Sequence, residues 1–146
     1  NLKNISGATV YTVSEKASDA EAEATALREN LSDDLAGIAV EEESQQVADI
    51  LIDLIRRETH GFSVRFARSL VGELSDTMEL INNPHRSAGF KVLKAPDVPS
   101  VLLELGYLSN PTGEGHLRDP DWRKRAAGSI VRAVGLFAQA KTGAGG

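Results

Sequence analysis

A short apolar run that ends in a glutamate most constrains the fold of this chain. The run at 101–103 precedes Glu104, and it is bounded by Pro99 and by a Ser-Asn-Pro turn at 109–111. A continuous apolar run of this length between turn residues is typical of an interior strand. Glu104 is then expected at the end of a buried strand, where α/β proteins commonly carry active-site groups. A charge in that place is costly unless the protein pairs it or uses it.

The pattern alone leaves Glu104 with two interpretations. It is either a catalytic carboxylate, or a rim glutamate that is solvated or paired with an arginine. A hydrolase that works with two carboxylates would need a second acid close to Glu104. Asp97 and Glu114 are the nearest acids in the sequence, and no pattern places either of them opposite Glu104.

Composition excludes several classes of function. The 146 residues carry a net charge of −5 and no cysteine. The absence of a basic run argues against nucleic acid as the main partner, and the absence of cysteine excludes disulfides and thiolate sites. No apolar stretch reaches the length of a membrane span, and residues 1–4 lack the apolar core of a signal peptide. The length suits one domain.

The remaining pattern predicts an α/β chain. Strands are expected over 8–13, 90–94 and 101–104, and a turn at Asn82-Asn83-Pro84. Helices are expected over 20–31 after a Ser18-Asp19 cap, and from Pro120 to Phe137 after an Asp119 cap. Two more are expected between them, one that ends at about Arg57 and one that begins after Gly61. The first of these helices has an alanine-rich, thinly apolar face made by Ala20, Ala24, Leu27 and Leu31. Such a helix gains little from burial and can move.

A stronger apolar stripe lies on the helix that is expected to end at Arg57. Its members are Val47, Ile50, Leu51, Leu54 and Ile55. Core packing is the default expectation for a stripe at helical spacing. The alternative is a helix that presents this face to a partner protein.

The segment around Glu104 resembles a known family signature. Residues 99–110 read PSVLLELGYLSN, and the zinc-dependent N-acetylmuramoyl-L-alanine amidases of bacterial cell separation have a pattern close to P-S-V-L-V-E-x-G-F-x-S-N. Residues 7–15, GATVYTVSE, are similar to the family's G-A-S-V-Y-T-L-S strand, and 28–30 and 90–96 also fit. The likeness runs from Gly7 to Phe137. It implies a mixed sheet flanked by helices, and a chain whose residues 1–142 form the C-terminal part of one catalytic domain, so that the domain is incomplete here. Residues 143–146 are expected to form a flexible tail.

The resemblance also implies a reaction and a metal. The family hydrolyses the amide between N-acetylmuramic acid and L-alanine in peptidoglycan, with zinc as cofactor. Glu104 would transfer the proton. The two histidines and one glutamate that bind zinc precede the G-A-S-V-Y-T strand, so the ligands are expected upstream of this chain, and this chain alone is expected to be inactive. His60, His85 and His116 show no ligand spacing.

A helical regulatory insertion is the third implication. Cell-division members carry one that occupies the cleft, places a glutamate on the zinc and holds the enzyme off until an activator protein displaces it. Ala17–Arg57 resembles this insertion, and Glu29 matches the position of the zinc-contacting glutamate. Glu21 and Glu23 are alternatives for the role. Glu29 could instead be a solvated glutamate paired with a lysine or arginine.

The resemblance places the protein in the periplasm or cell envelope, with peptidoglycan and an activator protein as partners. A second hypothesis is a non-catalytic fragment or partner-binding module, because the metal ligands are missing. A three-stranded remnant would expose a sheet edge and apolar surface. The isolated chain is therefore expected to be marginally stable or to associate.

Overall fold

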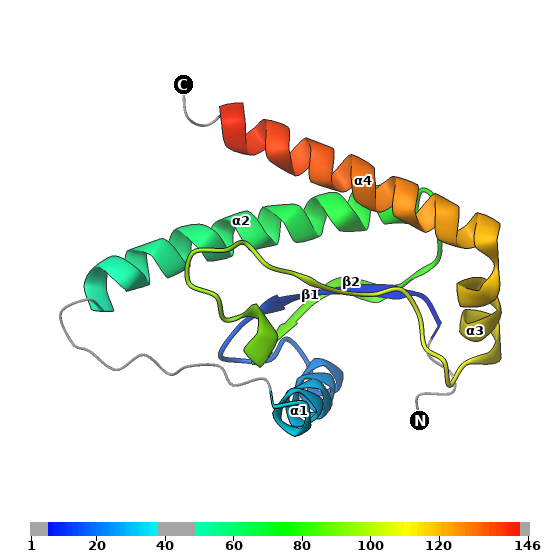
Figure 1. Cartoon of the computed structure of the whole chain (residues 1–146), viewed down its shortest axis with the longest axis horizontal. Helices are drawn as coiled ribbons and strands as arrows, with labels where there is room; N and C mark the ends of the chain where they lie inside the picture. Colours follow the sequence, from blue (N-terminus) through cyan, green and yellow to red (C-terminus); the bar gives the residue numbers. More distant parts are fainter. Residues whose placement is uncertain (1–5, 38–48, 144–146) are drawn as a thin grey trace. The chain divides into compact units, whose positions relative to one another are not determined.

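The computed structural model describes residues 6–37 and 49–143 of the chain (Figure 1). These residues form strands and helices. In order they are β1 (Ala8–Val13), α1 (Ala20–Leu35), α2 (Asp49–Ser75), β2 (Leu80–Ala88), the 3-10 helix η2 (Lys91–Leu93), β3 (Leu102–Glu104), α3 (Pro111–Arg118) and α4 (Pro120–Gly143). The strands form a mixed sheet in the order β2-β1-β3, and helices flank it, which confirms the α/β fold class. No helix among the described residues is long and apolar enough to cross a membrane.

The chain divides into two compact units, which are described in turn. Unit 1 comprises residues 1–10, 65–85 and 103–146, and unit 2 comprises 11–64 and 86–102. The prediction of one domain with an insertion at 17–57 stays a prediction. Of the predicted tail, Gly143 is the last residue of α4, and 144–146 lie outside the described residues.

Unit 2 is built around an aromatic pair. The rings of Tyr11 and Phe90 lie 5.0 Å apart at 54°, and both side chains are fully buried. Ala22 and Ala26 of α1 pack in the same cluster. Small residues let the helix approach the rings closely, so α1 contributes little apolar area of its own.

The structure confirms α1 but corrects its buried face. Asp19 caps the helix as predicted, because its carboxylate accepts a hydrogen bond of 2.9 Å from the Ala22 amide. The buried residues of α1 are Ala22, Thr25 and Ala26. The predicted face is wrong: Leu27 and Leu31 are 66% and 60% exposed. The helical period alone could not show that the small residues would meet the Tyr11–Phe90 pair.

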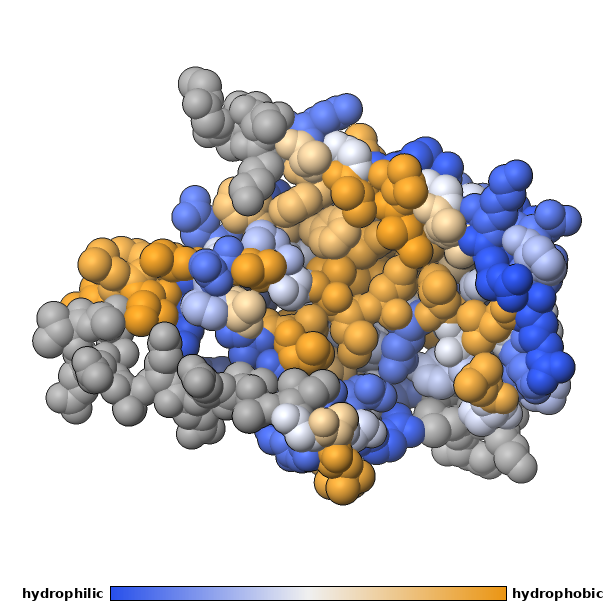
Figure 2. All heavy atoms as spheres, in the orientation of Figure 1, coloured by the Kyte–Doolittle hydropathy of each residue, from blue (hydrophilic) through white to orange (hydrophobic). Residues whose placement is uncertain are grey.

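Helix α2 is a single helix where two were predicted. Gly61 lies inside it, since one glycine costs a helix only about 1 kcal/mol relative to alanine. In the predicted apolar stripe, Ile50, Leu51, Leu54 and Ile55 are exposed, whereas Leu70 and Leu74, further along α2, are buried. Core packing of the N-terminal stripe was therefore a wrong expectation for the described residues, and Val47 lies outside them. Figure 2 shows apolar surface at the N-terminal end of α2 and on α1.

Unit 1 joins the C-terminal part of α2 to α4. The rings of Phe66 and Phe137 lie 5.0 Å apart. Arg132 Nε donates to the Glu73 carboxylate at 2.6 Å, and the hydroxyls of Thr77 and Ser129 share a 2.8 Å hydrogen bond. Within α4, Trp122, Ala126 and Ala133 are buried, whereas Val134 is exposed.

Two more predictions between 80 and 118 are corrected. Asn82-Asn83-Pro84 lies inside β2, where Asn83 has a φ of 52°. Because β2 is an edge strand of the described sheet, a proline there need not break a ladder hydrogen bond. Residues 109–111 open α3, since the Asn110 side chain caps the helix and Pro111 is its first residue.

Residues 90–94 do not form the predicted strand. They contain η2, and the nearby backbone pairs with a side chain instead of a neighbouring strand. The Asn30 side chain donates to the Gly89 carbonyl at 2.9 Å and accepts from the Lys91 amide at 2.8 Å. These contacts satisfy groups that a strand would offer to a ladder.

Candidate active site

Glu104 is the last residue of β3, as predicted, but its surroundings differ from the expectation. All three residues of β3 are half-buried, and β3 is an edge strand of the described sheet, so the prediction of a buried interior strand was wrong. Within unit 1 the Tyr107 hydroxyl donates a hydrogen bond of 2.9 Å to Glu104 Oε2. A carboxylate that accepts such a bond is oriented by it.

The loop after Glu104 is held by the start of α3. The Asn110 amide donates to the Tyr107 carbonyl at 3.1 Å. The Asn110 side chain then accepts from the amides of Thr112 and Gly113 at 2.9 and 3.1 Å. A Cβ at Gly113 would lie 2.9 Å from the Tyr107 carbonyl oxygen, so only glycine allows this close approach. The backbone that carries Tyr107 therefore has a defined position.

Strand β1, which carries the motif G-A-T-V-Y-T, also depends on one glycine. Gly7 precedes β1 with a φ of 111°, and a Cβ there would lie 2.8 Å from the backbone of Leu80 and Ile81. A side chain cannot fit without moving β2. The motif G-A-T-V-Y-T thus begins with glycine for a packing reason.

The described residues do not fit a zinc site of three protein ligands. No group of three or more His, Asp or Glu side chains that could hold a metal is found among them. His60 lies within α2, His85 within β2 and His116 within α3. His116 stacks on Trp122 with ring centroids 5.6 Å apart, which is a packing role. None of the three can be assigned as a ligand from this geometry.

The candidates for a second carboxylate are also accounted for. Glu114 forms an ion pair of 2.6 Å with Arg118, one turn further along α3. Asp97 is exposed and belongs to unit 2, whereas Glu104 belongs to unit 1. Neither observation supports a two-carboxylate mechanism at Glu104.

Glu29 is exposed on α1, in unit 2. Its neighbours are engaged: Arg28 binds the Ala24 carbonyl and the Thr25 hydroxyl, and Asn30 binds the backbone on both sides of Phe90. Within residues 6–37 and 49–143, no ion pair or hydrogen bond involves the Glu29 carboxylate. The predicted pairing with a lysine or arginine is therefore not seen in this part of the chain.

The two alternatives to Glu29 differ in their surroundings. Glu21 forms an ion pair of 2.6 Å with Arg86, whose side chain is only 12% exposed. Arg86 also lies 3.4 Å from Asp19. Burial alone would lower the pKa of Arg86, but the bond to Glu21 and the charges of both acids outweigh it and raise that pKa. Glu21 is thus committed to fastening α1, whereas Glu23 is exposed.

Asp19 also takes part in the polar contacts that hold the start of α1. Burial would raise the pKa of its carboxyl, but hydrogen bonds from the Ala22 amide and the Ser18 hydroxyl, together with Arg86, hold the pKa below its ordinary value. At the other end of α1, Lys91 Nζ lies 2.8 Å from Asp34. Polar contacts therefore fasten α1 at its start, middle and end.

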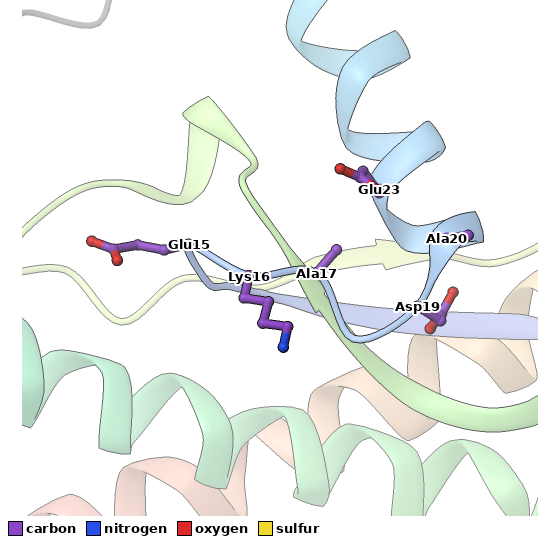
Figure 3. Close-up of a pocket in the computed structure, with 6 residues that line it drawn as sticks. All are labelled: Glu15, Lys16, Ala17, Asp19, Ala20 and Glu23. Carbon is purple, nitrogen blue, oxygen red and sulfur yellow. The ribbon is translucent and has the colours of Figure 1, made fainter.

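A depression at the start of α1 is lined mainly by charged residues (Figure 3). It is lined by Glu15, Lys16, Ala17, Asp19, Ala20 and Glu23. All the charged side chains among them are exposed. In Figure 3, Glu15 and Lys16 come from the segment after β1, and Glu23 comes from α1. Solvated charges of this kind do not make a binding site by themselves.

Three side chains that contact Glu104 or hold α1 were not predicted from the sequence. Tyr107 could have been found, because it lies three residues after Glu104, where the family pattern has phenylalanine. Asn30 and Arg86 could not, since their partners lie 59 and 65 residues away in the sequence.

Comparisons with known proteins agree on one family. The family model described as N-acetylmuramoyl-L-alanine amidase matches residues 1–135. The N-acetylmuramoyl-L-alanine amidase AmiC of Escherichia coli O6:H1 is 31% identical over 133 residues, which are 90% of this chain and 32% of that protein. AmiA of Escherichia coli K12 is 31% identical over 129 residues, which are 88% of this chain and 45% of that protein.

A solved structure shows the same fold. The N-acetylmuramyl-L-alanine amidase Ami1 of Mycobacterium smegmatis superposes with a TM-score of 0.54 at 17% identity, over 94% of this chain and 49% of that one. The chain thus spans less than half the length of each of these three relatives. Because the family model matches residues 1–135 of the 146 residues, the chain belongs to the N-acetylmuramoyl-L-alanine amidase family.

Proposed function

We propose that the protein carrying this chain hydrolyses the amide bond between N-acetylmuramic acid and L-alanine in peptidoglycan, and that it does so in the bacterial periplasm or cell envelope. Family membership supports the reaction class. The observation that carries the proposal is Glu104, which stands in the family motif with its carboxylate held by Tyr107. The proposed substrate follows the printed names of the relatives.

Glu104 has the chemistry of a general base and acid. A carboxylate in a half-buried site can accept a proton from the attacking water while the water oxygen bonds to the amide carbon. The same carboxyl can return that proton to the leaving nitrogen as the carbon–nitrogen bond breaks. The products are a free lactyl carboxylate on muramic acid and a peptide with a new L-alanine amino terminus.

We also propose that the active protein is zinc-dependent and that its zinc ligands come from outside the described residues. The resemblance to a zinc-dependent family motivates the metal, and no group of three side chains that could hold it is found among residues 6–37 and 49–143. Residues 1–146 alone are then expected to show no amidase activity. A stoichiometric tight zinc site in this chain, seen by titration, would contradict the proposal.

The reaction is tested by its products. Full-length protein is incubated with purified peptidoglycan, and soluble products are separated and identified by mass spectrometry. We expect stem peptides with a free L-alanine amino group, which amine-reactive labelling detects. Release of sugars without free L-alanine, or no release by the metal-loaded and activated protein, would contradict the proposed reaction.

Regulation by α1 is a further part of the proposal. Glu29 is exposed without a partner in the described chain, and α1 is fastened by polar contacts over a small apolar face. Such a helix can be displaced at modest cost. We therefore propose that the insertion at 17–57 holds the enzyme off and that Glu29 supplies the inhibitory carboxylate.

The test is the activity of full-length protein without an activator. Glu29→Gln is expected to raise it several-fold, and Glu58→Gln, an exposed glutamate on α2, serves as the control and should not change it. Activation by Glu23→Gln and not by Glu29→Gln would contradict the assignment of Glu29.

The proposed partner is an activator protein that binds this insertion. Large apolar side chains stand exposed there: Leu27, Leu31 and Leu35 on α1, and Ile50, Leu51, Leu54 and Ile55 on α2. Exposed apolar groups at helical spacing suit a protein partner with an apolar groove. Replacing Leu51 and Leu54 with serine should abolish activation while leaving the unactivated rate unchanged; full activation of this variant would contradict the proposal.

A further inference from the structure

We propose that Tyr107 is a positioning residue for Glu104: its hydroxyl orients the Glu104 carboxylate that accepts the proton. This inference rests on the proposed amidase function. The direct observation is the 2.9 Å hydrogen bond from the Tyr107 hydroxyl to Glu104 Oε2, between two half-buried side chains. Hydrogen bonds to a charged acceptor are the stronger kind.

The contact is built into the loop and does not depend on one free rotamer. The Asn110 amide binds the Tyr107 carbonyl, and Asn110 itself is fixed because it caps α3. Gly113 lies so close beneath Tyr107 that no side chain would fit between them. The start of α3 therefore holds the backbone from which the tyrosine reaches back to Glu104.

The position also offers a clean substitution. The family pattern given above has phenylalanine where this chain has Tyr107, so a phenyl ring is compatible with the fold at this site. Tyr107→Phe then removes one oxygen atom and leaves the ring packing in place. Any change in catalysis reports the hydroxyl, not a collapsed loop.

The expected effect is on the rate of proton transfer. Without the hydroxyl, the Glu104 carboxylate loses the hydrogen bond that orients it. In the zinc-loaded full-length protein, Tyr107→Phe should therefore lower kcat about tenfold, in line with one charge-assisted hydrogen bond. KM should stay the same, because the hydroxyl is assigned to Glu104 and not to substrate.

The controls separate the two claims. Leu108→Ala changes an exposed neighbour of the same loop and should keep the wild-type kcat and KM. Melting temperature and zinc content of each variant are measured alongside. A loss of kcat in Tyr107→Phe, with KM, melting temperature and zinc content unchanged, supports the inference. An unchanged kcat, or a loss of kcat/KM that comes from a higher KM, would overturn it. If the wild-type protein releases no L-alanyl peptide, the proposed function fails instead.

Discussion

The hydrogen bonds of Asn30 in α1 allow a sharp test of how this helix is held. Asn30 makes two hydrogen bonds to backbone groups, to the Gly89 carbonyl and from the Lys91 amide. Each is worth about 1 kcal/mol, and Asn30→Ala would leave both partners without the side chain, so the cost is about 2 kcal/mol. The next residue, Leu31, is 60% exposed, and Leu31→Ala should cost less than about 1 kcal/mol. A polar residue is thus predicted to matter more than a large apolar one.

Amide hydrogen exchange of α1 in the full chain measures this difference. A loss of about 2 kcal/mol corresponds to an opening equilibrium about 30-fold larger, and the α1 amides should exchange faster by that factor in Asn30→Ala. The amides of α4 should not change, because α4 belongs to unit 1. If Leu31→Ala speeds the exchange of α1 as much as Asn30→Ala does, the account of α1 as a helix held by polar contacts is refuted.

Three further predictions concern stability. The Thr9 hydroxyl is buried without a hydrogen-bond partner in the described chain, so Thr9→Val should raise the free energy of unfolding by about 1 kcal/mol in a denaturant titration; a decrease would contradict this. The pKa of Asp19 is lowered in the fold, so its contribution is present above the unfolded-state value near 4 and is lost as the pH falls through the lower folded-state value. The opening equilibrium of the α1 amides, obtained from exchange after correction for the intrinsic rate at each pH, should therefore rise below about pH 4, and Asp19→Asn should flatten that dependence; a wild-type opening equilibrium without such a rise would count against it. Gly113→Ala should cost about 1–3 kcal/mol by thermal melting, because its methyl group meets the Tyr107 carbonyl, whereas Gly115→Ala, with nothing within 4 Å, should be neutral; equal melting temperatures would contradict the packing argument.

Local signals in the sequence predicted the starts of elements well. β1 has the predicted bounds, and α1 and α4 begin where Asp19 and Pro120 placed them. These signals work because a cap or a proline acts within a few residues. Glu104 was found for the same reason, since a short apolar run and its turn lie next to each other in the chain.

Burial and long-range pairing were beyond local reasoning. The stripe on the first part of α2 was expected to pack in the core, yet it is exposed. The face of α1 was expected at Ala20, Ala24, Leu27 and Leu31, yet the structure buries Ala22 and Ala26 against Tyr11 and Phe90. The strand expected at 90–94 is replaced by η2, whose neighbouring backbone is bound by Asn30 from 59 to 61 residues away. Such choices depend on which elements meet, and the helical or strand period does not contain that information.

The site shows the same division. The role proposed for Glu104 rests on a motif of adjacent residues, whereas the Tyr107 contact needed the geometry of the turn into α3. The metal ligands were predicted to lie outside this chain, and that stays a prediction.

The proton-transfer role of Glu104 is tested most directly by the rate at which full-length, zinc-loaded Glu104→Gln releases L-alanyl peptides from peptidoglycan. Glu114→Gln, ten residues further on, is the matched control, because the Glu114 carboxylate forms an ion pair with Arg118 of the same helix. General acid–base catalysis of this kind contributes about 10²–10⁴-fold, so kcat should fall by that factor in Glu104→Gln, with zinc content and melting temperature unchanged and the control active. A Glu104→Gln protein that keeps the wild-type rate would contradict the account.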